Sequence, residues 1–197
     1  MSEHHHKETF VTKYIFSQDH KMIAKQYLFT GVFFMGIIGI LMSALMRMQI
    51  AWPEEPNIFF DFLLGKWAPE GVMDADIYLA LVTMHGTIMV FFVLTAGLSG
   101  TFSNLLIPLQ LGARDMASGF LNMVAFWLFF VSTVLMVASI FVEAGPAVAG
   151  WTIYPPLSAL EMAQPGSRLG MTLWLVSMAF FIASSLLGSL NYIVTVL

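Results

Sequence analysis

Four long apolar stretches constrain the fold of this chain more than any other feature of its sequence. They run from about 27 to 48, 77 to 107, 120 to 142, and 169 to the last residue. A bilayer core of about 30 Å requires roughly 20 apolar residues in a helix, so each stretch is long enough to cross it. Because backbone polar groups in lipid must bond internally, we predict four transmembrane helices and an all-α polytopic membrane protein.

The composition supports this class. Hydrophobic residues make up 58% of the chain and charged residues 10%, whereas a soluble domain carries roughly 25% charged residues. Cysteine is absent, which excludes disulfide bonds and thiolate metal sites. The polar start and the long first stretch do not resemble a cleavable signal peptide. We divide the chain into an N-terminal segment, 1–26, and a four-helix membrane portion, 27–197. Because the sequence is still apolar where it stops, we expect a longer protein.

The distribution of charged residues predicts the orientation in the membrane. Cytoplasmic flanks carry an excess of lysine and arginine. The N-terminal flank and the connection between the second and third stretches are basic, with Lys7, Lys13, Lys21, Lys25 and Arg114. The other two loops are acidic, with Glu54, Glu55, Asp61, Glu70, Asp74, Asp76, Glu143 and Glu161 against Lys66 and Arg168. We therefore predict that the N-terminus is cytoplasmic.

His85 is the only histidine inside an apolar stretch. An ionisable residue within a membrane is expensive and is read as functional by default. A neutral imidazole is also a good ligand for haem iron. The alternative is a histidine whose interhelical hydrogen bond serves packing alone. Gly86, Gly97 and Gly100 fit both interpretations, because they would let either a flat macrocycle or a neighbouring helix approach closely.

Polar residues gather toward the opposite, inner side. Asn104 lies nineteen residues beyond His85, about 28 Å deeper along a helix, and Asp115 follows in the inner connection. The third and fourth stretches add Asn122, Ser184, Ser185, Ser189 and Asn191. Ser184 and Asn191 are a heptad apart and share a helix face. These residues predict either a hydrated proton path or ordinary polar contacts between helices. Arg47, at the outer end of the first stretch, either reaches the interface or bonds a buried acceptor.

Several ordered motifs carry a family resemblance. They include Asp19-His20-Lys21, Met46-Arg47-Met48, His85-Gly86, the run from Leu111 to Ala117, the run from Gly150 to Ser158, and Ser184-Ser185 followed by Asn191. With them, the chain resembles the N-terminal third of subunit I of cytochrome c oxidase, the catalytic subunit of haem–copper terminal oxidases. The resemblance implies the first four helices of a twelve-helix bundle.

The resemblance also implies roles for individual residues. His85 matches an axial ligand of the low-spin haem, and Arg47 matches the arginine that bonds a haem substituent. Trp151 and Tyr154 match the outer loop on the propionate side of the haem. Seven residues match positions of the family's proton pathway, which starts at an aspartate: Asp115, Asn104, Asn122, Tyr27, Ser184, Ser185 and Asn191. The ligands of the high-spin haem and of copper belong to later helices of the family.

Departures from the family pattern bear on the cation site and on the electron donor. Gln49 replaces a glutamate at a non-redox cation site, and Ser118-Gly119-Phe120 replaces a proline-containing motif after the aspartate. Related quinol oxidases carry four polar groups at positions that are apolar here, namely Ile38, Met42, Ile77 and Ala80. This favours cytochrome c over quinol as the donor. The aspartate pathway also argues against a nitric oxide reductase.

We therefore expect part of an aa3-type, proton-pumping oxidase in a bacterial inner membrane, with haem A bound through His85. Its partners would be the rest of subunit I, subunits II and III, and cytochrome c or a membrane-bound cytochrome, with a respiratory supercomplex as a further expectation. Besides a quinol oxidase, two alternatives stay open: a membrane haem anchor that relays electrons, and a haem-free, proton-conducting transporter.

Overall fold

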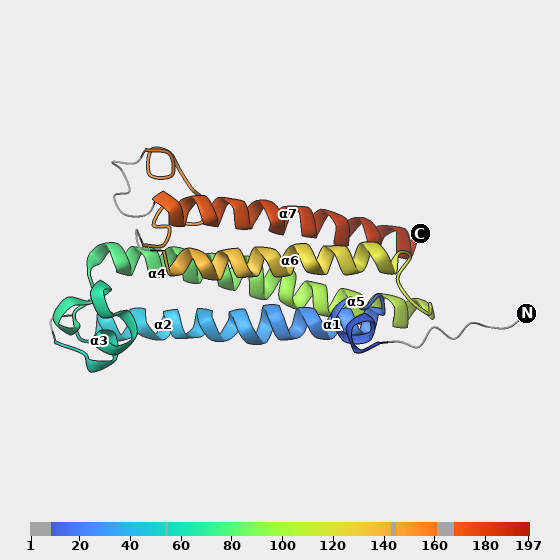
Figure 1. Ribbon diagram of the computed structural model, residues 1–197, viewed down its shortest axis with the longest axis horizontal. Helices are drawn as coiled ribbons and strands as arrows, with labels where there is room; N and C mark the ends of the chain where they lie inside the picture. The colour runs from blue at the N-terminus through green and yellow to red at the C-terminus, as the bar shows by residue number, and fades with distance from the viewer. Residues whose placement is uncertain (1–8, 54, 143–144, 161–167) are drawn as a thin grey trace, which may run out of the picture.

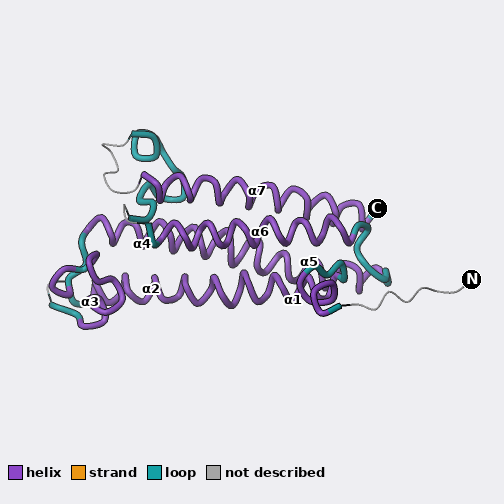
Figure 2. The backbone as a smooth tube through the Cα atoms, in the orientation of Figure 1, coloured by secondary structure: helices purple, strands orange, loops and turns teal. Residues whose placement is uncertain are grey.

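Four long helical stretches lie side by side in the computed structural model and run alternately in opposite directions (Figures 1 and 2). The structure describes residues 9–53, 55–142, 145–160 and 168–197. Within these ranges every regular element is helical. Four helices are long and apolar enough to cross a membrane, namely His20–Ala51, Ala75–Leu111, Gly119–Ile140 and Leu169–Val196. The predicted all-α polytopic fold with four spans is confirmed.

Each of the first two spans contains a wider π-helical segment between two α-helical ones. The first span consists of α1 (His20–Tyr27), η2 (Leu28–Met35) and α2 (Gly36–Ala51). The second consists of α4 (Ala75–Thr87), η5 (Ile88–Leu98) and α5 (Ser99–Leu111). The third and fourth spans are single helices, α6 (Gly119–Ile140) and α7 (Arg168–Val196).

The first span begins at His20, earlier than the predicted start near residue 27. Asp19 caps it, because the Asp19 carboxylate accepts a hydrogen bond from the Met22 N–H at 3.0 Å. The second span also extends beyond its predicted end, to Leu111, where Gly112 takes a left-handed φ of 69° and ends the helix. Part of the predicted N-terminal segment is therefore helical, while its division from the membrane portion stays a prediction.

Short elements cap one end of the bundle, between the first and second spans. They are α3 (Ile58–Leu64), η3 (Gly65–Trp67) and η4 (Pro69–Gly71). The Gln49 amide ties this cap to α2, donating to the Pro53 carbonyl and accepting from the Met73 N–H, both at 3.0 Å. At the other end, the π-helical turn η1 (Val11–Ile15) precedes α1.

Small and hydroxyl-bearing residues let the helices pack closely. A Cβ on Gly31 would lie 2.5 Å from the Gly97 Cα, so the backbones of η2 and η5 meet directly. Ser132 of α6 and Ser177 of α7 each donate to the other's carbonyl, at 2.8 and 2.7 Å. Phe92, Phe129 and other fully buried side chains fill the space between the spans.

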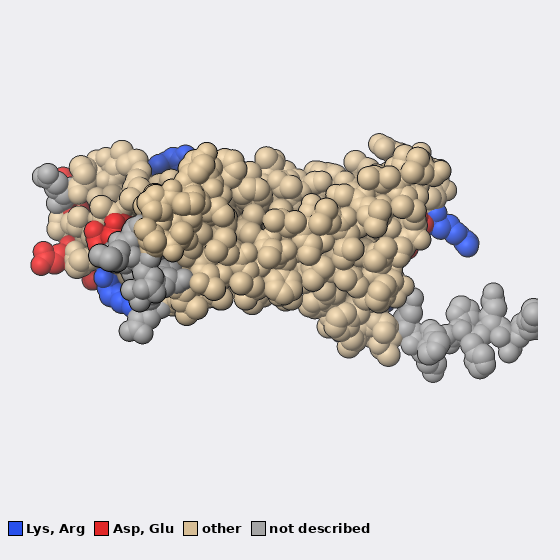
Figure 3. Space-filling view, turned by 90° about the horizontal axis from the view of Figure 1, so that it is seen from above, with Lys and Arg blue, Asp and Glu red and all other residues tan. Residues whose placement is uncertain are grey.

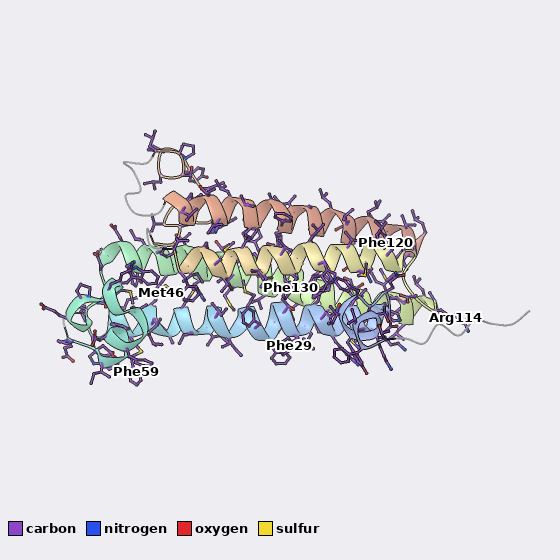
Figure 4. The ribbon with its side chains drawn as sticks, in the orientation of Figure 1. Phe29, Met46, Phe59, Arg114, Phe120 and Phe130 are labelled. Atoms are coloured by element: carbon purple, nitrogen blue, oxygen red, sulfur yellow. The ribbon has the colours of Figure 1, made fainter. Side chains whose placement is uncertain are left out.

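Charged side chains lie toward the two ends of the bundle, and the middle is free of them on the face drawn in Figure 3. Figure 4 places Arg114 and Phe120 at one end and Met46 and Phe59 at the other. Some charged groups used to predict the orientation lie outside what the structure describes, namely Lys7, Glu54, Glu143, Glu161 and the Arg168 side chain. The remaining residues keep the predicted pattern of one basic and one acidic end.

Candidate functional site

His85 lies on α4 and is half-buried against the first span. Its Nδ1 is 2.9 Å from the Gly39 carbonyl oxygen on α2. A carbonyl only accepts, so Nδ1 carries the proton, and in a neutral imidazole Nε2 keeps a free lone pair. Metal-ligating histidines are oriented in this way by a carbonyl on their other nitrogen. The interhelical hydrogen bond and a ligand role are therefore compatible, not alternatives.

Gly39 makes this contact possible. A Cβ at Gly39 would lie 2.5 Å from Met89 Sδ and 3.4 Å from Ile88 Cγ2, so a larger residue would have to displace the Met89 side chain. The absence of a side chain brings the Gly39 carbonyl within reach of the imidazole. Gly39 thus accepts the hydrogen bond that orients the His85 ring.

Arg47 lies about two turns beyond Gly39 on α2, roughly 12 Å along the helix axis. The guanidinium Nη1 donates to the Ser43 carbonyl at 3.2 Å, and the residue is exposed. The guanidinium can donate further hydrogen bonds in a planar fork, which suits a polar or anionic group beside this part of α2.

The loop 145–160 brings Trp151 toward the same helix. The Gly150 N–H donates to Thr83 Oγ1 at 3.1 Å, which ties the loop to α4. Trp151 Cδ1 would lie 4.0 Å from a Cβ on Gly86, the residue after His85. Both side chains are exposed, Trp151 to 54% and Tyr154 to 71%. The structure therefore brings one edge of Trp151 close to Gly86, while Tyr154 lies on the surface of the loop.

Asp115 meets the start of α1 at the other end of the bundle. Its Oδ1 accepts from the backbone N–H groups of His20 at 3.3 Å and Met116 at 2.7 Å. The His20 ring is buried, and its Nδ1 is 2.8 Å from the Asn104 carbonyl oxygen. His20 precedes the first apolar stretch, so its place in the sequence does not indicate a buried histidine. Asp19, a capping residue directly before it, was the available signal that the helix already starts there.

Asn104 and Asn122 are fully buried and carry unsatisfied amide atoms. Asn104 Nδ2 donates to the Gly100 carbonyl at 2.7 Å and to the Tyr192 hydroxyl at 3.0 Å. Among the residues that the structure describes, Asn104 Oδ1 and both amide atoms of Asn122 have no protein hydrogen-bond partner. Buried polar groups are rarely left unpaired, and ordered water is their usual partner. The unsatisfied amide atoms of both residues are therefore candidate positions for ordered water.

A small, partly open cavity of about 70 Å³, lined by polar and apolar side chains, lies among the first, second and fourth spans. Tyr27, Ser184 and Ser185 line it, so the structure brings these three predicted pathway residues together. Gly100 makes room for the Tyr27 ring, because a Cβ there would lie 2.7 Å from Tyr27 Cδ1. Tyr192 also lines the cavity, although a lone tyrosine in an apolar helix forms no pattern that predicts this position.

The Asn191 side chain bonds the connection between α5 and α6. Its Oδ1 accepts from the Ser118 N–H at 3.0 Å, and its Nδ2 donates to the Ser118 carbonyl at 3.1 Å. Ser118 in turn caps α6 through the Leu121 N–H. Asn191 therefore clamps the connection that follows Asp115. Ser184 and Asn191 are both buried, as expected for residues on one face of the helix.

Residues 22–197 match the family described as cytochrome c and quinol oxidase polypeptide I. The chain belongs to this family. It is 41% identical over 195 residues to the alternative cytochrome c oxidase subunit 1 of Bradyrhizobium diazoefficiens, which covers 99% of this chain and 30% of that protein. It is 39% identical over 183 residues to the cytochrome c oxidase subunit 1 of Thermostichus vulcanus, covering 93% of this chain and 29% of that protein.

The likeness extends to the heme-copper oxidase subunit I+III of Aeropyrum pernix, at 36% identity over 187 residues, 95% of this chain and 20% of that protein. The chain thus spans about 30% or less of the length of these relatives. Haem and copper are the cofactors that membership of this haem–copper oxidase family implies. Among the described residues, no group of three or more His, Asp or Glu side chains is placed to hold a metal ion.

Proposed function

We propose that this chain is the N-terminal part of the catalytic subunit of a proton-pumping terminal oxidase, which reduces oxygen to water with electrons from cytochrome c. The observation that carries the proposal is the hydrogen bond from His85 Nδ1 to the Gly39 carbonyl. It holds the imidazole in the tautomer and orientation that an axial haem ligand requires. Family membership supplies the reaction class.

A low-spin haem A would be held by His85, with Arg47 bonding a ring substituent and Trp151 and Tyr154 on the propionate side. When bound, this haem supplies one-electron transfer, and the oxygen-reducing haem–copper centre would be ligated by later helices of the family. The chain itself contributes orientation through Gly39, a positive charge through Arg47 and a tryptophan cover beside Gly86.

Protons would enter at Asp115 on the cytoplasmic side. They would move toward the middle of the membrane past Asn104 and Asn122, to the cavity lined by Tyr27, Ser184 and Ser185. The unsatisfied amide atoms of the two asparagines and the cavity support this route. Asn191 would act on the route indirectly, since it clamps Ser118 in the connection that carries Asp115.

An apolar cavity favours cytochrome c over quinol as the donor. It has a volume of about 260 Å³ between α2, α4 and α6, and its walls are Ile, Leu, Met, Val, Phe, Trp and Pro side chains. Ile38, Met42 and Ile77 line it. These are three of the four positions at which the related quinol oxidases carry polar groups. A quinol headgroup placed there would lose hydrogen bonds to water without regaining them.

In this proposal the protein lies in a bacterial inner membrane with its N-terminus in the cytoplasm. The basic end of the bundle, with Lys21, Lys25 and Arg114, supports that orientation. Its partners would be the rest of subunit I, oxidase subunits II and III, and cytochrome c or a membrane-bound cytochrome.

The proposal is tested by a reduced-minus-oxidised spectrum of the complete complex and of its His85→Ala variant. We expect a haem A signal whose low-spin component is lost in the variant, because no other described histidine lies within the outer half of a span. His20→Ala is the matched control, since the ring Nδ1 of His20, like that of His85, contacts a backbone carbonyl of another span. It should keep the low-spin signal.

The other outcomes favour other functions. Retention of the full low-spin signal in His85→Ala would remove His85 as the ligand. Haem B alone would favour an electron-relay anchor or a b-type relative. No haem signal would favour a proton-conducting transporter.

A further inference from the structure

Tyr192 joins two parts of the proposed proton route. It lies on α7 directly after Asn191 and is half-buried. Its hydroxyl oxygen accepts a hydrogen bond from Asn104 Nδ2 at 3.0 Å, between residues 88 positions apart in the chain. The same tyrosine lines the 70 Å³ cavity that holds Tyr27 and Ser184. One side chain therefore touches both the asparagine and the cavity.

The hydrogen bonds of Asn104 determine which way its amide points. The Gly100 carbonyl, 2.7 Å from Nδ2, only accepts, so the NH₂ group faces Gly100. The second N–H of that group goes to the Tyr192 hydroxyl. Oδ1 is thereby left as a buried acceptor with no protein partner among the described residues. Tyr192 and Gly100 together keep this acceptor available for water.

The Tyr192 hydroxyl can also donate a hydrogen bond. A phenol accepts and donates, and here Asn104 occupies an accepting position. The cavity beside it has room for roughly two ordered waters and presents the hydroxyls of Ser184, Ser185 and Ser189 as further partners. On the other side, the backbone carbonyl of Asn104 lies 2.8 Å from the His20 ring Nδ1, and the backbone N–H of His20 donates to Asp115 Oδ1. Asn104 and Asp115 are therefore both packed against His20.

We propose that Tyr192 is a positioning residue of the proton pathway: its hydroxyl holds the Asn104 amide and connects it to the water of the serine-lined cavity. This inference rests on the proposed function, because it assigns Tyr192 to the pathway that begins at Asp115. Tyr192 acts through Asn104 and through water, and it keeps its own proton.

The test is Tyr192→Phe in the complete oxidase, which keeps the ring and removes the hydroxyl. Proton uptake is followed with a pH-indicator dye as the reduced enzyme reacts with oxygen, over a range of pH, together with the absorption of the haems. We expect uptake slower by about fivefold, the effect of losing one net hydrogen bond in an ordered chain. The haem spectrum and the rate of low-spin haem reduction should not change, whereas general damage to packing would alter them.

Tyr14→Phe is the matched control, since Tyr14 is an exposed tyrosine near the same end of the bundle, and its uptake should equal that of the parent enzyme. Asp115→Asn in the same assay separates the two proposals. If Asp115→Asn slows uptake and Tyr192→Phe does not, the role of Tyr192 is overturned and the pathway stands. If Asp115→Asn has no effect, the pathway itself is overturned, and the role of Tyr192 with it.

A second variant covers a Tyr192→Phe enzyme that fails to assemble. Ser189→Ala removes one hydroxyl from the same cavity with little loss of volume. Slower uptake would support the connection through cavity water, and an unchanged rate at every pH would overturn it.

Discussion

Asp115 lies at the point where the connection between α5 and α6 meets the start of α1, and two backbone N–H groups hold its Oδ1. An asparagine could keep both bonds through its own Oδ1 but could not exchange a proton near neutral pH. We expect Asp115→Asn to abolish pumping and to slow turnover by about tenfold or more, while the haem spectrum stays intact. Oxygen consumption and the pH change outside vesicles measure both effects.

Asp19→Asn is the control at the same end of the bundle. Asp19 caps α1 through the Met22 N–H, and asparagine is an equally good capping residue. Its turnover and pumping should match those of the parent enzyme. Normal proton uptake in Asp115→Asn would remove Asp115 from the pathway.

At the scale of helical elements, the contact between η2 and η5 depends on two glycines. A Cβ on Gly31 would lie 2.5 Å from the Gly97 Cα and 3.0 Å from the Phe92 carbonyl oxygen, and neither backbone atom can move aside alone. Gly31→Ala should therefore separate the first two spans and cost about 1–3 kcal/mol of stability. Thermal loss of the haem absorption in the complete complex measures it as a lower midpoint.

Gly36→Ala provides a comparison within the same span. A Cβ on Gly36 would lie 4.0 Å from Val93 Cγ2, which is an ordinary contact. Its midpoint should stay close to that of the parent complex. Equal midpoints for the Gly31 and Gly36 variants would contradict a role for the close η2–η5 approach in stability.

The whole molecule has a basic end and an acidic end, and the even number of spans brings the start of α1 and the end of α7 to the same one (Figure 1). The chain contains no cysteine, so single cysteines report orientation cleanly. In intact cells, with other reactive cysteines removed, we expect a membrane-impermeant maleimide to label Asp61→Cys and to spare Arg114→Cys. Labelling of the two positions in the reverse order would invert the proposed orientation.

The sequence by itself determined the four spans, because a bilayer demands a fixed length of apolar residues and that property is read along the chain. It also determined the helical face shared by Ser184 and Asn191, since the period of a helix is local. His85 could be identified for the same reason, because an ionisable residue in an apolar stretch is recognised from the local sequence alone.

Only the tertiary structure decided which polar atoms meet. His20 bonds residues 84 and 95 positions away, Tyr192 reaches Asn104 across 88 positions, and Asn191 clamps Ser118 across 73. These pairings depend on how closely the spans approach one another, which glycines such as Gly31 and Gly39 permit. Apolarity is a property of each stretch, whereas a hydrogen bond between spans needs both partners in place, so the first could be read from the sequence and the second could not.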